Sequence, residues 1–149
     1  MKTLSLTQPY ASLVAVGVKK LETRSWPTRY RGPLLIHAAS GFPGWAREFA
    51  AAPSVKARLH DVPPQNLPRG VLLAVVHLVD CRPTTERPPA PGTDEAEMGD
   101  YGPKRFIWEM RLVYRLEFPY RVAGRLGLWE FNHLMLPERM RIEQRLQAS

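Results

Sequence analysis

The chain has 149 residues, of which 44% are hydrophobic and 23% charged, and this composition fits one globular domain with its own core. No apolar run is long enough to cross a bilayer, the N-terminus lacks the apolar stretch of a signal peptide, and the single cysteine, Cys81, excludes an internal disulfide, so we expect a cytoplasmic protein without membrane association. The net charge of +7, supplied mostly by arginine, indicates either a phosphate-bearing partner or simply a solvated basic surface.

The first half of the chain alternates short strand patterns with helix patterns. In chain order the patterns predict a strand at residues 2–6, a helix at 8–16, a strand or extended loop at 19–26, a strand at 33–38, a helix from 41 to 53, a short helix or turn at 54–60, and a strand at 70–80. Thr7 can cap the first helix and Gly17 can stop it, because these residue types favour helix ends. Pro53 is expected to end the second helix.

The second half of the chain contains a long irregular segment between strands. After the strand at 70–80, we expect a loop at 82–102, strands at 105–116 and 128–131, and a C-terminal helix within 137–149. The loop is rich in proline and then acidic, with room for one helical turn at 93–98. In the stretch 105–116 apolar and polar residues alternate, which indicates a half-buried strand. A long loop in a compact domain is usually either functional or disordered.

Several short strands, separated by proline and glycine turns and accompanied by few helices, predict an α+β fold built on a small β-barrel decorated by short helices. Internal repeats are absent, and nothing in the composition marks a second domain. We therefore expect a single domain over residues 1–149.

Motifs of common metal and cofactor sites are absent from the sequence. It has no glycine-rich phosphate loop of the Walker type, no His-Glu-x-x-His zinc motif and no Cys-x-x-Cys pair. The histidines are isolated from one another, at positions 37, 60, 77 and 133. We therefore expect neither a metal nor a cofactor.

The stretch 17–26 concentrates the charged residues that suit a binding site. In a strand, side chains at alternate positions share a face, so Glu22, Arg24 and Trp26 would lie together. Lys19 can act as a point charge for phosphate, or as a base if burial lowers its pKa. Glu22 can accept hydrogen bonds from the amino group of a base or activate a water, and Arg24 can bind phosphate.

Two interpretations of these residues stay open on spacing alone. Trp26 and Tyr30 offer faces on which a base could stack, which favours a pocket for a flat polar ligand. Alternatively, the lysine, glutamate and arginine form a ladder of surface ion pairs with little effect on stability.

Three blocks of the sequence resemble the ASCH domain family, which belongs to the PUA-like superfamily. They are residues 4–13, with the Gln-Pro-Tyr-Ala helix start; residues 17–26, which contain Gly-x-Lys-x-x-Glu-x-Arg; and residues 31–37. The strand that starts at Gly70 and the block 124–129 also fit, so the resemblance covers most of residues 3–131.

This resemblance implies a PUA-like β-barrel with a cleft lined by Lys19, Glu22 and Arg24. ASCH domains are regarded as RNA-binding modules, and some members are enzymes. One branch hydrolyses the acetyl amide of acetylated cytidine nucleosides with the motif lysine, a threonine three residues later and a glutamate from a later loop. This chain has Glu22 in place of the threonine, and the loop glutamate has three possible counterparts, Glu86, Glu95 and Glu97.

We therefore expect an ASCH-domain protein that binds RNA, another single-stranded nucleic acid or a modified nucleoside. The residues expected to line the site are Gln8, Tyr10, Lys19, Glu22, Arg24, Ser25, Trp26, Arg29, Arg31 and His37. Lys19 and the basic turn 29–31 would meet phosphate, while Trp26 or Tyr10 would stack on a base.

Two alternatives belong to other functional classes. In a hydrolase, Lys19 would be the base and Glu22 would assist it, acting on acetylated cytidine nucleosides or, without a metal, on RNA. In a protein-interaction module, the contrast between the acidic loop 94–100 and the basic N-terminal part of the chain would be the signature.

Overall fold

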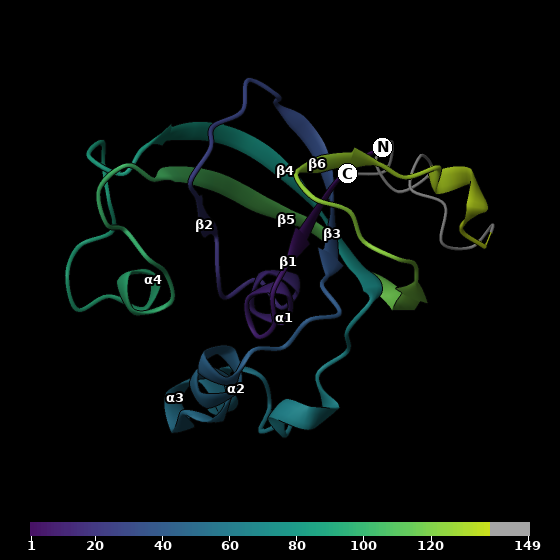
Figure 1. The fold of residues 1–149 in the computed structure, drawn as a ribbon, viewed down its shortest axis with the longest axis horizontal. Helices are drawn as coiled ribbons and strands as arrows, with labels where there is room; N and C mark the ends of the chain where they lie inside the picture. The colour runs from purple at the N-terminus through teal and green to yellow at the C-terminus, as the bar shows by residue number, and fades with distance from the viewer. Residues whose placement is uncertain (138–149) are drawn as a thin grey trace.

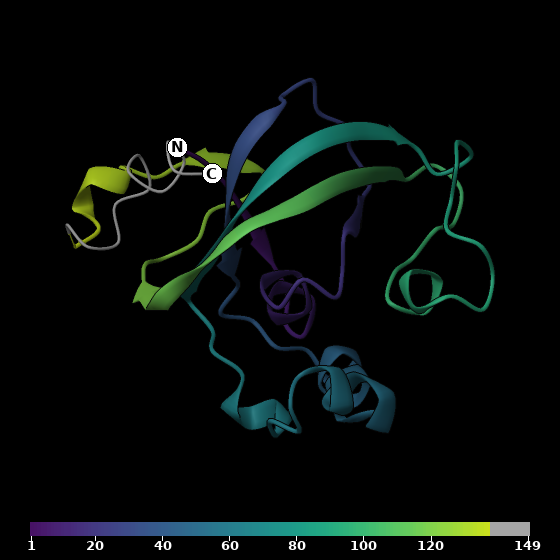
Figure 2. The same cartoon turned by 180° about the vertical axis from the view of Figure 1, so that it is seen from behind.

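The computed structural model describes residues 1–137, and its core element is one curled, mixed six-stranded sheet (Figures 1 and 2). The strands are β1 (Lys2–Leu6), β2 (Leu21–Arg24), β3 (Gly32–Ala38), β4 (Val71–Pro83), β5 (Phe106–Arg121) and β6 (Leu128–Glu130), in the spatial order β2-β5-β4-β3-β1-β6. Only β1 and β3 run parallel, and the other neighbours are antiparallel. The sheet curls into a half-barrel, in agreement with the predicted α+β class.

Short helices cover one side of this sheet. They are α1 (Tyr10–Ala15), α2 (Gly44–Ala51), α3 (Pro53–Arg58) and α4 (Asp94–Glu97), and a 3₁₀ turn at Pro64–Asn66 contacts α2. A second 3₁₀ turn, His133–Met135, follows β6 and lies beside Tyr120 of the opposite face. Helix α1 lies against the sheet, and α2 and α3 pack on the far side of α1 (Figure 1). None of the helices in residues 1–137 is long and apolar enough to cross a membrane.

Apolar side chains pack on both faces of the sheet. One cluster lies between the sheet and α1 and includes Leu4, Val76 and Trp108. A second lies on the opposite face and includes Leu116 and Trp129. A third cluster joins α1 to α2, α3 and the segment after α4. Because α1 belongs to two of these clusters, it fixes the helices relative to the sheet.

Several predicted boundaries differ from the structure. The first helix begins at Tyr10, where Thr7 contributes its backbone carbonyl rather than its side chain. Pro53 is the first residue of α3, because proline fits the first helical turn. Strands β4 and β5 extend beyond their predicted ends, to Pro83 and Arg121. The helix predicted within 137–149 lies outside the described residues, apart from Pro137.

Candidate functional site

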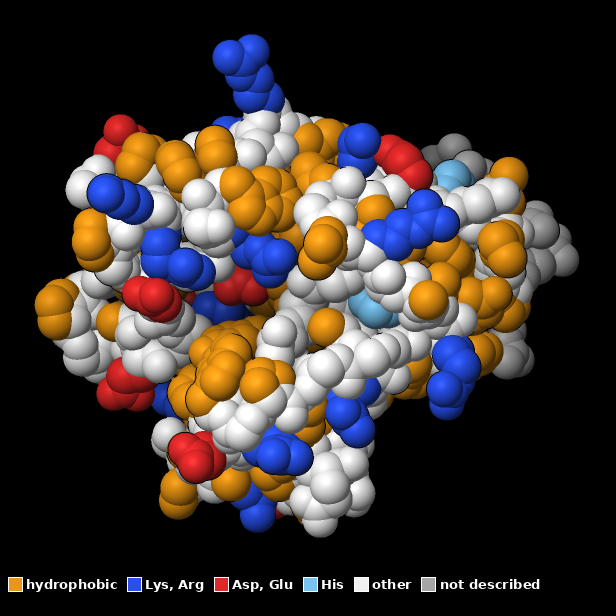
Figure 3. Space-filling model, in the orientation of Figure 1, with side chains coloured by type: hydrophobic (Ala, Val, Ile, Leu, Met, Phe, Trp, Pro, Cys, Tyr) orange, Lys and Arg blue, Asp and Glu red, His pale blue; other side chains and the backbone are white. Residues whose placement is uncertain are grey.

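A polar cavity of about 310 Å³ opens between α1, β2, α2 and the segment that follows α4. The residues that line it are Thr7, Tyr10, Glu22, Thr23, Arg24, Trp45, Gly99, Asp100 and Arg105. Figure 3 shows a hollow on this side of the molecule in which acidic and basic side chains meet beside hydrophobic ones. A cavity of this size and composition suits a polar ligand with a flat face.

Strand β2 supplies the charged floor of the cavity. Glu22 and Arg24 alternate along the strand and pair with Trp108 and Phe106 of β5. Glu22 is only 8% exposed, and its carboxylate accepts a hydrogen bond of 3.0 Å from the Thr23 amide. Arg24 Nη1 lies 4.0 Å from Glu22 Oε2 and donates to the Ser5 carbonyl at 3.3 Å. The two charges therefore form a loose, half-buried pair rather than an exposed ladder.

Aromatic rings form the wall opposite this floor. Tyr10 stacks on Phe49 with ring centroids 5.4 Å apart, and Trp45 lies 6.3 Å from Tyr10. Trp45 is 59% exposed, which leaves much of its indole open to a ligand. Trp26 has a different place, because its ring packs edge-on against the buried Trp108 at 4.8 Å. The stacking surfaces of the cavity are therefore Tyr10 and Trp45.

Lys19 carries a positive charge into the interior beside the cavity. Its side chain is 2% exposed, and its ammonium donates to the Met98 carbonyl at 2.7 Å and lies 5.5 Å from the centre of the Tyr10 ring. Burial lowers the pKa of Lys19, while the negative charges of Glu22 and Glu95 partly offset this effect. A lysine in such surroundings gives up its proton more readily than an exposed one.

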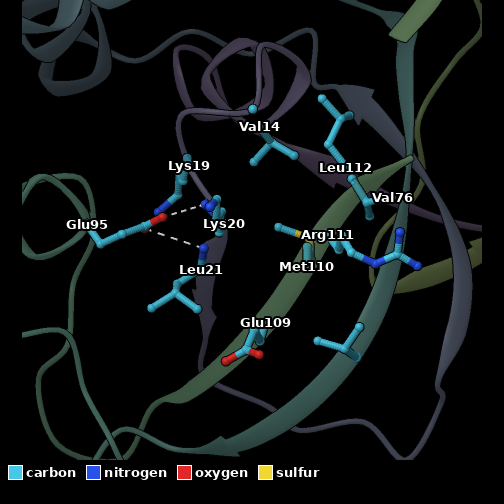
Figure 4. Close-up of a pocket in the computed structure, with 12 residues that line it drawn as sticks. Val14, Lys19, Lys20, Leu21, Val76, Glu95, Glu109, Met110, Arg111 and Leu112 are labelled. Atoms are coloured by element: carbon cyan, nitrogen blue, oxygen red, sulfur yellow. Dashed lines mark hydrogen bonds between the residues drawn. The ribbon is translucent and has the colours of Figure 1, made fainter. Parts of the chain in front are cut away.

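Lys19 also borders a second, more apolar cavity of about 620 Å³ between α1, β2 and β5 (Figure 4). Here the Glu95 carboxylate accepts hydrogen bonds from the backbone amides of Lys20 at 2.5 Å and Leu21 at 3.4 Å. Of the three possible loop glutamates, Glu95 is the one that the fold brings to β2. Glu97 is exposed, and Glu86 lies in the turn after β4, where its carbonyl accepts a hydrogen bond from Arg82.

The structure places several predicted site residues away from the polar cavity. Gln8 is fully buried and bonds to Ser12 and the Pro68 carbonyl, so it holds α1 in place. Arg31 pairs with Asp80 at 3.7 Å. His37 is 1% exposed and hydrogen-bonded through both ring nitrogens, and burial lowers its pKa. The predicted residues outside the cavity lining are Gln8, Lys19, Ser25, Trp26, Arg29, Arg31 and His37.

Other lining residues were not predicted from the sequence. Arg105 donates to the carbonyls of Thr23 at 3.0 Å and Asp100 at 3.2 Å, and it thereby ties the start of β5 and the loop after α4 to β2. Trp45 comes from α2. The antiparallel register of β2 and β5 brings Arg105 here, and the β2 motif carries no information about that register. No cluster of three or more metal-ligating side chains exists among residues 1–137.

Comparison with known proteins agrees with this architecture. The chain is 42% identical to mouse "Activating signal cointegrator 1" and 41% identical to the human protein, over 81 residues in each case. The match covers 52% of this chain and 14% of each relative, so the chain corresponds to a small part of those proteins. A sequence model of the ASCH domain matches residues 4–119, which include β1 to β4 and most of β5. The predicted PUA-like fold is thereby confirmed, and the chain belongs to the ASCH domain family.

Proposed function

We propose that the protein binds single-stranded RNA, or a nucleoside of similar shape, in the polar cavity. The observation that carries this proposal is the meeting of Tyr10, Trp45, Glu22 and Arg24 around one space of about 310 Å³. Base–aromatic stacking and contacts to phosphate are the two main sources of affinity for single strands, and both kinds of group are present.

Each group has a distinct role in this proposal. A base stacks on Trp45 or Tyr10, because these rings wall the cavity. The Glu22 carboxylate accepts a hydrogen bond from the exocyclic amino group of that base. Arg24 binds phosphate with donors that the Ser5 carbonyl does not use. Lys19 adds a positive field from behind the Tyr10 ring.

A titration of single-stranded RNA against the protein at about 50 and about 200 mM salt tests this function. We expect the affinity to fall with salt, because each phosphate contact releases counterions. Arg24→Ala should lower the affinity at least about tenfold at low salt, as expected for the loss of a charge-assisted hydrogen bond. Arg111→Ala removes the same charge from an exposed position of β5 and is the matched control. Failure of the wild type to bind at low salt contradicts the proposal.

A second candidate, hydrolysis of an acetylated cytidine nucleoside, is favoured by one observation, the almost complete burial of the Lys19 side chain, which lowers the pKa of this lysine. In this reaction neutral Lys19 takes a proton from a water that adds to the acetyl carbonyl, with Glu22 assisting. The C–N bond then breaks, the amine takes up the proton, and acetate is released. Chromatography after incubation with N4-acetylcytidine tests the reaction, with Lys20→Ala as control. Absence of turnover, or full turnover by Lys19→Ala, contradicts it.

We further propose a cytoplasmic location. The supporting observation is that Cys81 is a free, half-buried thiol, as is usual in a reducing compartment.

A further inference from the structure

The loop between β5 and β6, residues 122–127, is held firmly against the sheet. His37 Nε2 donates to the Val122 carbonyl at 2.7 Å, and the Val122 amide donates to the Gly70 carbonyl at 3.1 Å. The other ring nitrogen of His37, Nδ1, accepts from the Ser5 hydroxyl at 2.9 Å, which in turn accepts from Trp129 Nε1 at 3.2 Å. Every donor in this chain of hydrogen bonds has an acceptor when His37 is neutral.

Gly124 lies tightly against two residues of the sheet. A β-carbon at Gly124 would lie 2.6 Å from His37 Cε1 and 2.8 Å from the Ser5 hydroxyl oxygen. Only glycine therefore allows the loop to lie so close to these two residues, and the loop has a fixed position from which to present its other side chains.

Those side chains are the kind that bind nucleic acid. Arg121 and Arg125 are exposed, and neither forms an ion pair or hydrogen bond with any described residue outside the strand pairing. Arg121 lines one cavity of about 480 Å³ with Arg69 and another of about 280 Å³ with Arg125. Leu126, next to Arg125, is 99% exposed. A leucine side chain that is almost fully exposed to water has no role in the core.

The loop also lies close to the polar cavity, because Ser5 contacts residues of both. Arg24 on the cavity floor donates to the Ser5 carbonyl, and the Ser5 hydroxyl contacts both His37 and the Gly124 position. Only one residue, Ser5, therefore separates Arg24 of the cavity from the loop.

We propose that residues 121–126 form a second contact surface for the same single-stranded nucleic acid. Arg121 and Arg125 bind its phosphates, and Leu126 packs against a base, as apolar wedges do in other nucleic-acid complexes. This inference rests on the proposed function of the cavity and adds to it a direction for the strand and a minimum length. A short strand reaches the cavity alone, whereas a longer strand engages both surfaces.

Binding of three-residue and ten-residue oligocytidylates, measured at several salt concentrations, separates the two surfaces. We expect the wild type to bind the ten-residue strand at least about tenfold more tightly than the three-residue strand. Arg121→Ala/Arg125→Ala should remove this advantage. For the longer strand, the slope of log affinity against log salt concentration should become shallower by about 1.4, because two phosphate contacts are lost and each contributes about 0.7. Leu126→Ser should weaken binding of the longer strand without changing stability, because the Leu126 side chain is 99% exposed. Arg111→Ala/Arg115→Ala removes the same charge elsewhere on β5 and is the control.

The outcomes distinguish the two proposals. Equal binding of both strands by the wild type, or equal losses in the loop variant and the control, overturns the second surface and leaves the cavity proposal standing. If polyglutamate displaces the ten-residue strand as well as unlabelled RNA does, the loop binds acidic proteins instead. This result also overturns the second nucleic-acid surface. If the wild type binds neither strand, both proposals fail.

Discussion

At the scale of single residues, the unusual feature is the charge of Lys19. The ammonium is almost completely buried and has one hydrogen bond to a described residue, from Nζ to the Met98 carbonyl. Taking an ammonium out of water costs several kcal/mol unless partners compensate it. Glu22 and Glu95 supply part of that compensation through their fields. The buried ammonium of Lys19 therefore lowers the stability of the folded protein, and it places a positive charge beside the cavity.

This charge should make stability depend on pH in the alkaline range. Burial lowers the pKa of Lys19 in the folded state, so the unfolded chain binds more protons between that lowered pKa and the ordinary value of 10.5. The free energy of unfolding should therefore rise with pH across this window. Lys19→Met should lose this rise and be more stable than the wild type at neutral pH by about 1 kcal/mol or more.

Urea unfolding from neutral pH to about pH 10 measures this difference, with Lys20→Met as control because Lys20 is exposed. A constant difference between wild type and Lys19→Met over the whole range would contradict the argument.

At the scale of elements, the pairing of β2 with β5 builds the site, and the loop after β5 depends on one glycine. The β-carbon that alanine would add at Gly124 falls well inside contact distance of His37 and Ser5. Neither neighbour can yield easily, since both belong to the hydrogen-bonded chain that ends at Val122.

Gly124→Ala should therefore lower the free energy of unfolding by about 1–3 kcal/mol, the usual cost of forcing extra atoms into a packed contact. Gly41→Ala is the matched control, because a β-carbon there meets nothing within 4 Å, and its effect should stay within about 0.5 kcal/mol. Denaturant unfolding measures both. Equal effects of the two substitutions would show that the contact at Gly124 relaxes freely.

The elements also show what the sequence could and could not predict. Strand β1 has the predicted ends, since its apolar residues and the polar turn after it leave little choice. The alternation in 105–116 predicted one buried face, and this was wrong. The even-numbered residues from Phe106 to Leu112 pack in the first cluster, but those from Tyr114 to Tyr120 pack in the second. An extra residue between the partners of Val75 and Val76 turns the strand over, and an unbroken alternation cannot reveal such a bulge.

The same limit applies to the site. Tyr10, Glu22 and Arg24 come from one segment of the chain, and their meeting followed from local spacing and family resemblance. Trp45 and Arg105 reach the cavity only through the packing of α2 and the register of β5, which depend on contacts between distant parts of the chain. Residues of that kind become visible only in three dimensions.

At the scale of the whole molecule, the first and second apolar clusters share the same sheet. Because β4 and β5 contribute to both, neither cluster can lose its packing without disturbing the other. This is the physical basis for expecting the described residues, 1–137, to behave as one domain.

A urea titration followed by amide NMR signals tests that expectation. Signals of Leu4 and Trp108 in the first cluster, and of Leu116 and Trp129 in the second, should disappear at the same urea concentration. Two separate midpoints would divide the chain into units that unfold independently.

The pairing of β1 with β6 has a consequence for how such a unit can be linked to other proteins. The Met1 ammonium donates to the Phe131 carbonyl at 2.6 Å and lies 3.2 Å from the Glu130 carboxylate, so the first residue and the last strand are direct neighbours. A segment joined ahead of Met1 would start at this edge of the sheet and would turn the ammonium into an uncharged amide, so the ion pair with Glu130 would be lost. The β1–β6 edge is therefore sensitive to what is fused to the N-terminus.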